Sequence, residues 1–135
     1  MTAQAPQQSV SVLGTGNFGQ AIGKRLLRSQ YDVTFGSRRP KSRDLQKTRD
    51  DTFGTPRVVG MREAMKESDV IVLALRVANF QSFAREFRSD VAGKIIVDVS
   101  NRSKSTPVSS SNAEFLQGLL PEARVVKAFR GVTEP

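Results

Sequence analysis

Short apolar runs alternate with amphipathic stretches along most of this chain. Each run has the length of a β-strand, and continuous apolar runs are typical of strands covered on both faces of a parallel sheet. We interpret as strands residues 9–13, 32–35, 57–59, 70–75, 95–99 and 125–129. Gly14 and Gly36 directly follow the first two runs and are expected to end them.

Between these runs, apolar side chains recur at helical spacing. Phe18, Ile22 and Leu26 predict a helix over residues 17–29. A second apolar stripe predicts a core-facing helix that ends at Gly93. That stripe consists of Phe80, Phe83, Ala84, Phe87 and Val91.

Local signals predict three shorter helices. Residues 61–67 are expected to form one or two turns. Pro40 suits the first turn of a short polar helix that ends near residue 50. Ser111 and Glu114 have the spacing of a capping box, which opens a helix before Pro121.

Alternating strands and helices without an internal repeat indicate an α/β protein. We expect a Rossmann-type, doubly wound parallel sheet of about six strands with flanking helices. The 135 residues suffice for one domain, which we place at residues 9–135, after a flexible polar tail at residues 1–8. No apolar run approaches the roughly 20 residues that span a bilayer, and the tail lacks the layout of a signal peptide.

A glycine-rich turn follows the first predicted strand and opens the first predicted helix. It reads Gly14-Thr15-Gly16-Asn17-Phe18-Gly19, the G-x-G-x-x-G pattern of dinucleotide-binding folds. In such a fold Gly14 permits the tight turn, Gly16 lets the backbone approach a pyrophosphate, and Gly19 lets the helix pack closely on the strand. The helix N-terminus supplies N–H groups and partial positive charge for the phosphates.

The end of the second predicted strand favours NADP(H) over NAD(H). An NAD site has an Asp or Glu there, which accepts hydrogen bonds from the ribose hydroxyls. Here the strand runs into Ser37, Arg38 and Arg39, and no carboxylate follows until Asp44. A hydroxyl and two guanidinium groups would bind a 2′-phosphate, which a carboxylate would repel. The sequence therefore predicts NADP(H) as the cofactor.

The chain carries 21 basic and 13 acidic residues, a net charge of +8. Eight of the basic residues lie between Arg38 and Arg62, close to the predicted phosphate site. A nucleic-acid-binding domain is the weakest interpretation, because no such motif is visible and the phenylalanines follow core periodicity. The sequence contains no cysteine and no histidine, which excludes disulfides, the usual zinc sites and histidine-ligated haem from these 135 residues.

Five segments together resemble the cytosolic N-terminal domain of the STEAP-type metalloreductases (six-transmembrane epithelial antigen of the prostate). That domain is related to the microbial deazaflavin-dependent NADP reductases. The segments are the glycine turn Gly-Thr-Gly-Asn-Phe-Gly and residues 35–41, 93–101, 111–114 and 125–129. The likeness covers nearly the whole chain, from about Val10 to Phe129.

In that family the domain binds NADPH and passes hydride to a flavin, and electrons then cross the membrane through a haem to reduce ferric or cupric ions. The resemblance implies that residues 14–19 hold the pyrophosphate. It implies that the 2′-phosphate is held by Ser37, Arg38, Arg39 and Lys41. It also implies that the ribose and nicotinamide are approached by Leu75, Arg76, Ser100 and Asn101. We assign no catalytic residue and no metal ligand, because the cofactor carries the chemistry of hydride transfer.

The chain also departs from the family pattern. The family commonly has a His-Arg-Glu-His-Tyr run where residues 76–80 read Arg-Val-Ala-Asn-Phe, and Asn where this chain has Arg130. The family domain continues further and is followed by six membrane helices. We therefore expect FAD to bind only with a partner or with that C-terminal part, and no haem in this chain. The sequence looks like a truncated isoform, a divergent paralogue or a piece of a longer protein.

Two functions remain open at this point. One is a catalytic module that oxidises NADPH and reduces free or partner-bound flavin in a metal-reductase system. The other is a regulatory NADP(H)-binding protein without its own turnover, which pairs with itself or with a full-length membrane metalloreductase. Family members present this domain on the cytosolic side of the membrane, so a cytoplasmic location is expected for either function.

Overall fold

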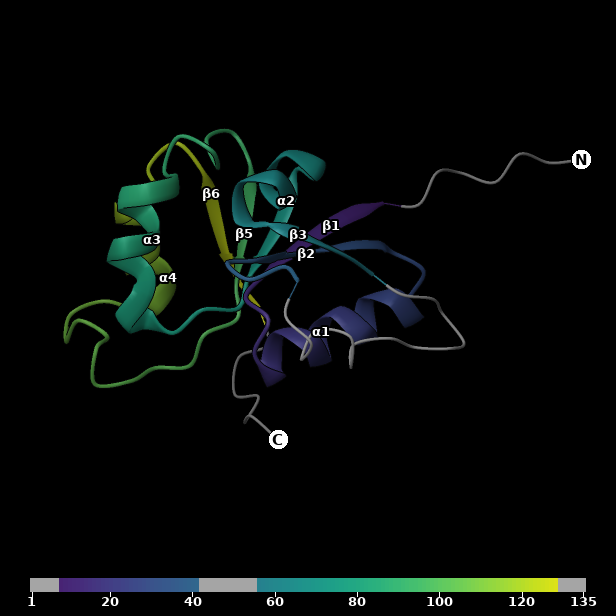
Figure 1. Ribbon diagram of the computed structural model, residues 1–135. Helices are drawn as coiled ribbons and strands as arrows, with labels where there is room; N and C mark the ends of the chain where they lie inside the picture. Colours follow the sequence, from purple (N-terminus) through teal and green to yellow (C-terminus); the bar gives the residue numbers. More distant parts are fainter. Residues whose placement is uncertain (1–7, 42–55, 129–135) are drawn as a thin grey trace, which may run out of the picture.

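One parallel sheet of six strands forms the centre of the computed structural model, which describes residues 8–41 and 56–128 (Figure 1). The strands are β1 (Ser9–Leu13), β2 (Asp32–Ser37), β3 (Arg57–Gly60), β4 (Val70–Leu73), β5 (Ile95–Asp98) and β6 (Arg124–Lys127). Their order in the sheet is β3-β2-β1-β4-β5-β6, that of a doubly wound Rossmann fold. The predicted fold class is confirmed.

Four α-helices cover the two faces of the sheet in the described part of the chain. They are α1 (Asn17–Arg28), α2 (Met61–Glu67), α3 (Phe80–Phe87) and α4 (Asn112–Leu119), with a short 3-10 helix, η2 (Val77–Asn79), before α3. One apolar cluster joins α1 to the sheet, and a second joins α2, α3 and α4 to it. In Figure 1, α1 and α2 lie on opposite sides of the sheet.

The apolar runs form strands because both faces of the sheet are covered. Successive side chains of a strand point to opposite faces. In β1, Val12 belongs to the cluster beneath α1, while Leu13 belongs to the cluster beneath α2. Ser11 is a buried polar exception, and its hydroxyl donates a hydrogen bond of 2.6 Å to the Ala64 carbonyl of α2. This bond ties the helix to the central strand.

Strand β2 runs two residues further than its apolar run predicts, through Gly36 to Ser37. Gly36 pairs in register with Leu13, so the prediction that it ends the strand is wrong. A Cβ atom at Gly36 would lie 2.5 Å from the Cδ2 atom of Leu13. The missing side chain therefore allows close packing within the sheet rather than a turn.

Strand β4 ends at Leu73, two residues before its predicted end. The neighbouring strand β1 ends in register with it, at Leu13, so the pairing stops there. Helix α3 ends at Phe87, and its apolar stripe continues through turns to the fully buried Val91. The length of each element is thus set by its neighbours rather than by its own apolar pattern.

Three predictions lie largely or wholly outside the described residues. They are the tail at residues 1–8, the helix expected to end near residue 50, and the last residue of the strand at 125–129. The predicted helix at 17–29, by contrast, corresponds to α1 within one residue. The capping box at Ser111 and Glu114 is also confirmed, with both of its hydrogen bonds present.

Gly23 provides a test of how tightly α1 packs on β2. A Cβ atom at Gly23 would lie 2.1 Å from the Cζ atom of Phe35, whose side chain is fully buried. We expect Gly23→Ala to lower the free energy of unfolding by about 1–3 kcal/mol, because the added methyl group has no space. Urea unfolding measures this loss.

Gly118→Ala in α4 is the matched control for this substitution. Nothing lies within 4 Å of a Cβ atom at Gly118, so alanine there should be neutral or stabilising by up to about 1 kcal/mol. If both variants unfold at the wild-type urea concentration, α1 does not pack on β2 as described.

Candidate cofactor-binding site

A cleft of about 840 Å³ opens at the carboxyl ends of β1, β4 and β5. Three segments form its walls, at residues 16–19, 74–78 and 99–105. Strands β1 and β4 are neighbours, and the strand order reverses between them. Open α/β sheets bind their ligands at this reversal, outside the carboxyl ends of the strands.

The first wall is the glycine turn, and two of its glycines are required by packing. Gly14 has a φ of +107°, and a Cβ atom there would lie 2.4 Å from the Ala74 carbonyl oxygen. A Cβ atom at Gly19 would lie 2.2 Å from the Gly14 carbonyl oxygen. Gly16 differs, because nothing lies within 4 Å of its Cβ position. The protein itself leaves the space at Gly16 open, and this glycine lines the cleft.

Helix α1 begins at this turn with its N-terminus in the cleft wall. Gly16 is the N-cap, no side chain caps the helix, and no acidic residue lies in its first turn. The first N–H groups of a helix have no partner within the helix, and they carry partial positive charge. An anionic group in the cleft would therefore be stabilised at residues 16–19.

The predicted 2′-phosphate residues lie beside the cleft, at the carboxyl end of β2. Ser37 is buried, and its hydroxyl accepts a hydrogen bond of 2.9 Å from the Arg39 N–H. The Arg38 guanidinium lies 3.2 Å from the Glu86 carboxylate and 5.7 Å from the centre of the Phe87 ring. Neither these residues nor Lys41 belong to the walls of the cleft. A ligand that reaches both regions has to cross the glycine turn.

The other two walls contain Leu75, Arg76, Ser100 and Asn101. Arg76 and Asn101 are exposed, whereas only 9% of Ser100 is exposed. The Ser100 hydroxyl donates to the Asp98 carboxylate and accepts from the Asn112 amide, so the protein itself uses this side chain. Ser100 thus contributes its backbone to the wall, and the neighbouring Asn101 contributes a side chain.

Sequence reasoning missed the rest of the third wall, residues 102–105. They belong to a polar loop with no apolar periodicity, so no sequence signal placed them near the glycine turn. It also gave no role to Asp98, Asn112 and Lys127, which support this loop. The one available signal for this support was Asp98 itself, a charged residue at the end of a buried apolar run.

In residues 8–41 and 56–128 no group of acidic residues is arranged to hold a metal ion. No helix in the same residues combines the length and apolar character needed to cross a membrane.

Comparison with known proteins assigns the chain to a family. Residues 9–102 match the family model described as NADP oxidoreductase, coenzyme F420-dependent. This chain is a member of that family. It is also 33% identical, over 132 residues, to Metalloreductase STEAP2 of Mus musculus, which confirms the resemblance found in its sequence. The chain is therefore an NADP-dependent oxidoreductase domain related to the STEAP metalloreductases.

Two further relatives support this assignment. The F420-dependent NADP reductase of Methanocaldococcus jannaschii is 26% identical and matches 88% of this chain. The crystal structure of a putative F420-dependent NADP reductase from Arthrobacter sp. FB24 superposes with a TM-score of 0.72, at 26% identity over 87% of this chain. The chain spans 25% of the mouse metalloreductase and 60% of each of these two reductases.

Gly16→Val should abolish binding of the dinucleotide and leave the fold intact. Its side chain would enter the space beside the α1 N-terminus, where a pyrophosphate would lie, and nothing lies within 4 Å of its Cβ position. Titration with NADPH measures binding, and circular dichroism reports the fold.

Gly60→Val is the control for the loss of stability that valine causes at the N-cap of a helix. Gly60 is the N-cap of α2, has similar backbone angles, and also has open space at its Cβ position. Both variants should unfold at similar temperatures. Tight NADPH binding by Gly16→Val would show that the glycine turn is not part of the binding site.

Proposed function

We propose that this chain binds NADP(H) across the carboxyl end of its sheet and presents the nicotinamide for hydride transfer to a flavin-type acceptor. The observation that carries this proposal is the open cleft at the uncapped N-terminus of α1, next to a β2 end without a carboxylate. In this arrangement residues 14–19 hold the pyrophosphate. The adenosine lies toward β2, and the nicotinamide lies toward β4 and β5.

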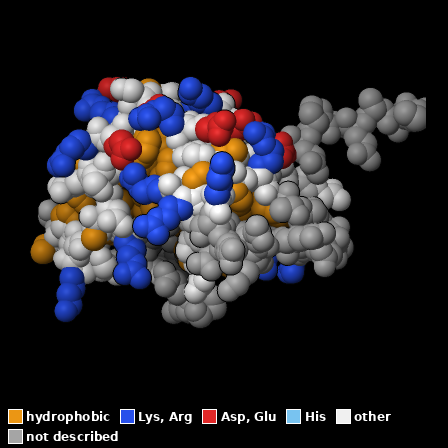
Figure 2. All heavy atoms as spheres, in the orientation of Figure 1, with side chains coloured by type: hydrophobic (Ala, Val, Ile, Leu, Met, Phe, Trp, Pro, Cys, Tyr) orange, Lys and Arg blue, Asp and Glu red, His pale blue; other side chains and the backbone are white. Residues whose placement is uncertain are grey.

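The 2′-phosphate is assigned to Ser37, Arg38, Arg39 and Lys41. The ion pair between Arg38 and Glu86 has a mostly exposed guanidinium, and exposed ion pairs contribute little to stability. Arg38 can therefore exchange Glu86 for a phosphate at low cost, and its planar guanidinium suits paired hydrogen bonds to phosphate oxygens. Figure 2 shows Lys and Arg side chains spread over the face of the molecule that is seen in Figure 1. A net charge of +8 favours the approach of a phosphorylated ligand.

The residues assigned to the nicotinamide half are Leu75, Arg76, Ser100 and Asn101. When bound, NADPH supplies a hydride, and the protein supplies position and electrostatics. No side chain in this part of the cleft needs to act as an acid or base. The name of the family supports a flavin-type acceptor, since coenzyme F420 is a deazaflavin. The name of the metalloreductase relatives indicates metal ions as final acceptors in those proteins.

A second function is a regulatory one, in which the chain binds NADP(H) without turnover and pairs with a copy of itself or with a longer metalloreductase. The two functions share the cofactor site and differ only in hydride transfer. A cytoplasmic location is proposed for either one.

Arg38→Ala should weaken NADPH binding by about 2 kcal/mol, near thirtyfold, and leave NADH binding almost unchanged. Removing the guanidinium removes charge-assisted hydrogen bonds to the 2′-phosphate, which NADH lacks. Calorimetric titration with both cofactors measures this selectivity. Equal losses for NADPH and NADH would show that Arg38 does not meet the 2′-phosphate.

Arg57→Ala is the matched control. Arg57 is 58% exposed and lies 3.2 Å from Glu67, whereas Arg38 is 60% exposed and lies 3.2 Å from Glu86. Arg57 is the first residue of β3 and does not line the cleft. Its removal lowers the net charge equally, so NADPH affinity should change by less than about twofold.

NADPH oxidation by the purified chain should require added flavin. Ferric and cupric ions accept single electrons, whereas NADPH delivers a hydride, so a carrier such as FAD has to act between them. Loss of nicotinamide absorbance, followed with chelated iron and with or without FAD, measures this dependence. Rapid iron reduction without flavin would contradict the proposal, and no oxidation with any flavin would favour the regulatory function.

A further inference from the structure

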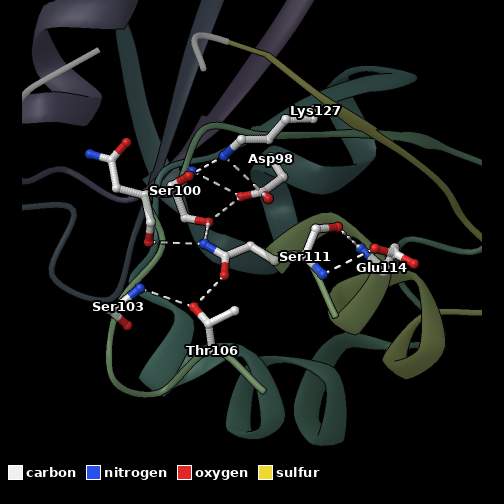
Figure 3. Close-up of polar contacts among 9 residues, drawn as sticks. Asp98, Ser100, Ser103, Thr106, Ser111, Glu114 and Lys127 are labelled. Carbon is white, nitrogen blue, oxygen red and sulfur yellow. Dashed lines mark hydrogen bonds and ion pairs between the residues drawn. The ribbon is translucent and has the colours of Figure 1, made fainter. Parts of the chain in front are cut away.

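A polar network supports the third wall of the cleft, and four of its members, Asp98, Ser100, Thr106 and Asn112, are buried (Figure 3). It joins the end of β5, the end of β6 and the first residue of α4. Its members are Asp98, Ser100, Ser103, Thr106, Asn112 and Lys127. These residues come from segments that are separate in the sequence, and only the fold brings them together.

Asp98 fixes the direction in which the chain leaves β5. Its side chain is fully buried, and its Oδ1 atom accepts hydrogen bonds from both the N–H (2.9 Å) and the hydroxyl (2.6 Å) of Ser100. Lys127, paired in register with Asp98, donates to the carbonyl oxygen of the same Ser100. The peptide groups on both sides of Ser100 are thus held by two side chains.

Asn112 fixes the remainder of the loop. Its amide donates to the Ser100 hydroxyl (2.8 Å) and to the Asn101 carbonyl (2.9 Å), and its oxygen accepts from the Thr106 hydroxyl. Asn112 is the first residue of α4, directly after the capping box of Ser111. Hydrogen bonds with the Ser111 backbone, and to a lesser extent with its hydroxyl, hold the pKa of Glu114 below its ordinary value. The hydrogen bonds of Asn112 thus attach the loop to the capped first turn of α4.

The Asp98 carboxylate is costly to bury, and hydrogen bonds satisfy it only in part. Among the described residues, its Oδ2 atom accepts no hydrogen bond, and the Lys127 Nζ atom lies 3.6 Å away. A buried ion pair often stabilises a fold less than apolar side chains of the same size. Packing alone therefore gives little reason for Asp98 and Lys127, whereas both of them hold Ser100.

We propose that Asp98 and Lys127 are positioning residues for the nicotinamide half of the cofactor, acting through the backbone of Ser100 and Asn101. This inference rests on the proposed function. In the sheet order, β5 and β2 lie on opposite sides of β1, so a dinucleotide with its 2′-phosphate at β2 extends its nicotinamide toward β5. The network then sets the wall against which the nicotinamide half lies, and leaves the adenosine half unaffected.

The test compares two ligands. NADP⁺ reaches both halves of the site, whereas adenosine 2′,5′-bisphosphate has the 2′-phosphate and lacks the nicotinamide. We expect Lys127→Met to weaken NADP⁺ by about tenfold and the bisphosphate by less than about twofold. The fluorescence anisotropy of the nicotinamide in bound NADPH should also fall, because its wall is no longer fixed. Calorimetry and fluorescence measure these changes.

Three variants separate positioning from a general loss of structure. Lys94→Met is the matched control, since the Lys94 ammonium donates to the carbonyls of Met65 and Ser68 at the opposite end of the sheet. It should lower the unfolding temperature without changing either affinity. Asp98→Leu has a similar shape but no acceptor for the two hydrogen bonds from Ser100, and it should repeat the selective loss. This variant keeps the test available if Lys127→Met does not fold. Combining Asp98→Leu with Lys127→Met should add little to the loss, because both act on Ser100.

Each outcome decides the question. Equal weakening of both ligands, or unchanged affinity and unchanged nicotinamide anisotropy in Asp98→Leu, would overturn the positioning role. Failure of the wild-type chain to bind either ligand would instead overturn the proposed function itself. Selective weakening of NADP⁺ with loss of anisotropy supports the inference.

Discussion

The glycine turn, residues 14–19, passes the end of β4 with no room for a side chain at Gly14 or at Gly19, and the rest of the site depends on this close approach. The Cβ positions of Gly14 and Gly19 would overlap the carbonyl oxygens of Ala74 and Gly14. Only glycine allows α1 to start this close to the sheet, and the close start brings its N-terminus to the point where the strand order reverses. The cleft, and the partial positive charge that the α1 N-terminus brings to it, depend on this close approach of the glycine turn to the end of β4.

The two halves of the site are built by different physical means. On the β2 side three of the predicted phosphate residues, Arg38, Arg39 and Lys41, are exposed cations, and Arg38 forms a surface ion pair with Glu86. Such groups can reorient when a ligand arrives. On the β5 side a fully buried carboxylate and a set of short hydrogen bonds fix the loop in advance. The arrangement combines an adaptable anchor for a phosphate with a fixed wall near the proposed reaction centre.

The sequence alone was sufficient for most of the fold. Continuous apolar runs and apolar stripes at helical spacing are a direct consequence of burial, and they indicate the strands and the helices α1 and α3 without knowledge of tertiary contacts. The capping box indicates α4 in the same local way. Element ends were less predictable, since β4 stops where β1 stops and β2 continues through Gly36 because Leu13 fills the space of its side chain. Those limits depend on neighbouring strands that are distant in the sequence.

For the site, the sequence determined the glycine turn, the family and the preference for a basic, carboxylate-free end of β2, because each is encoded within a few consecutive residues. Only the tertiary structure showed that residues 102–105 line the same cleft, and that the Ser100 hydroxyl is hydrogen-bonded to Asp98 and Asn112. It alone placed Lys127 beside Asp98, through the pairing of β5 with β6. These contacts join residues that are far apart in the chain, and no local pattern specifies which of them will meet.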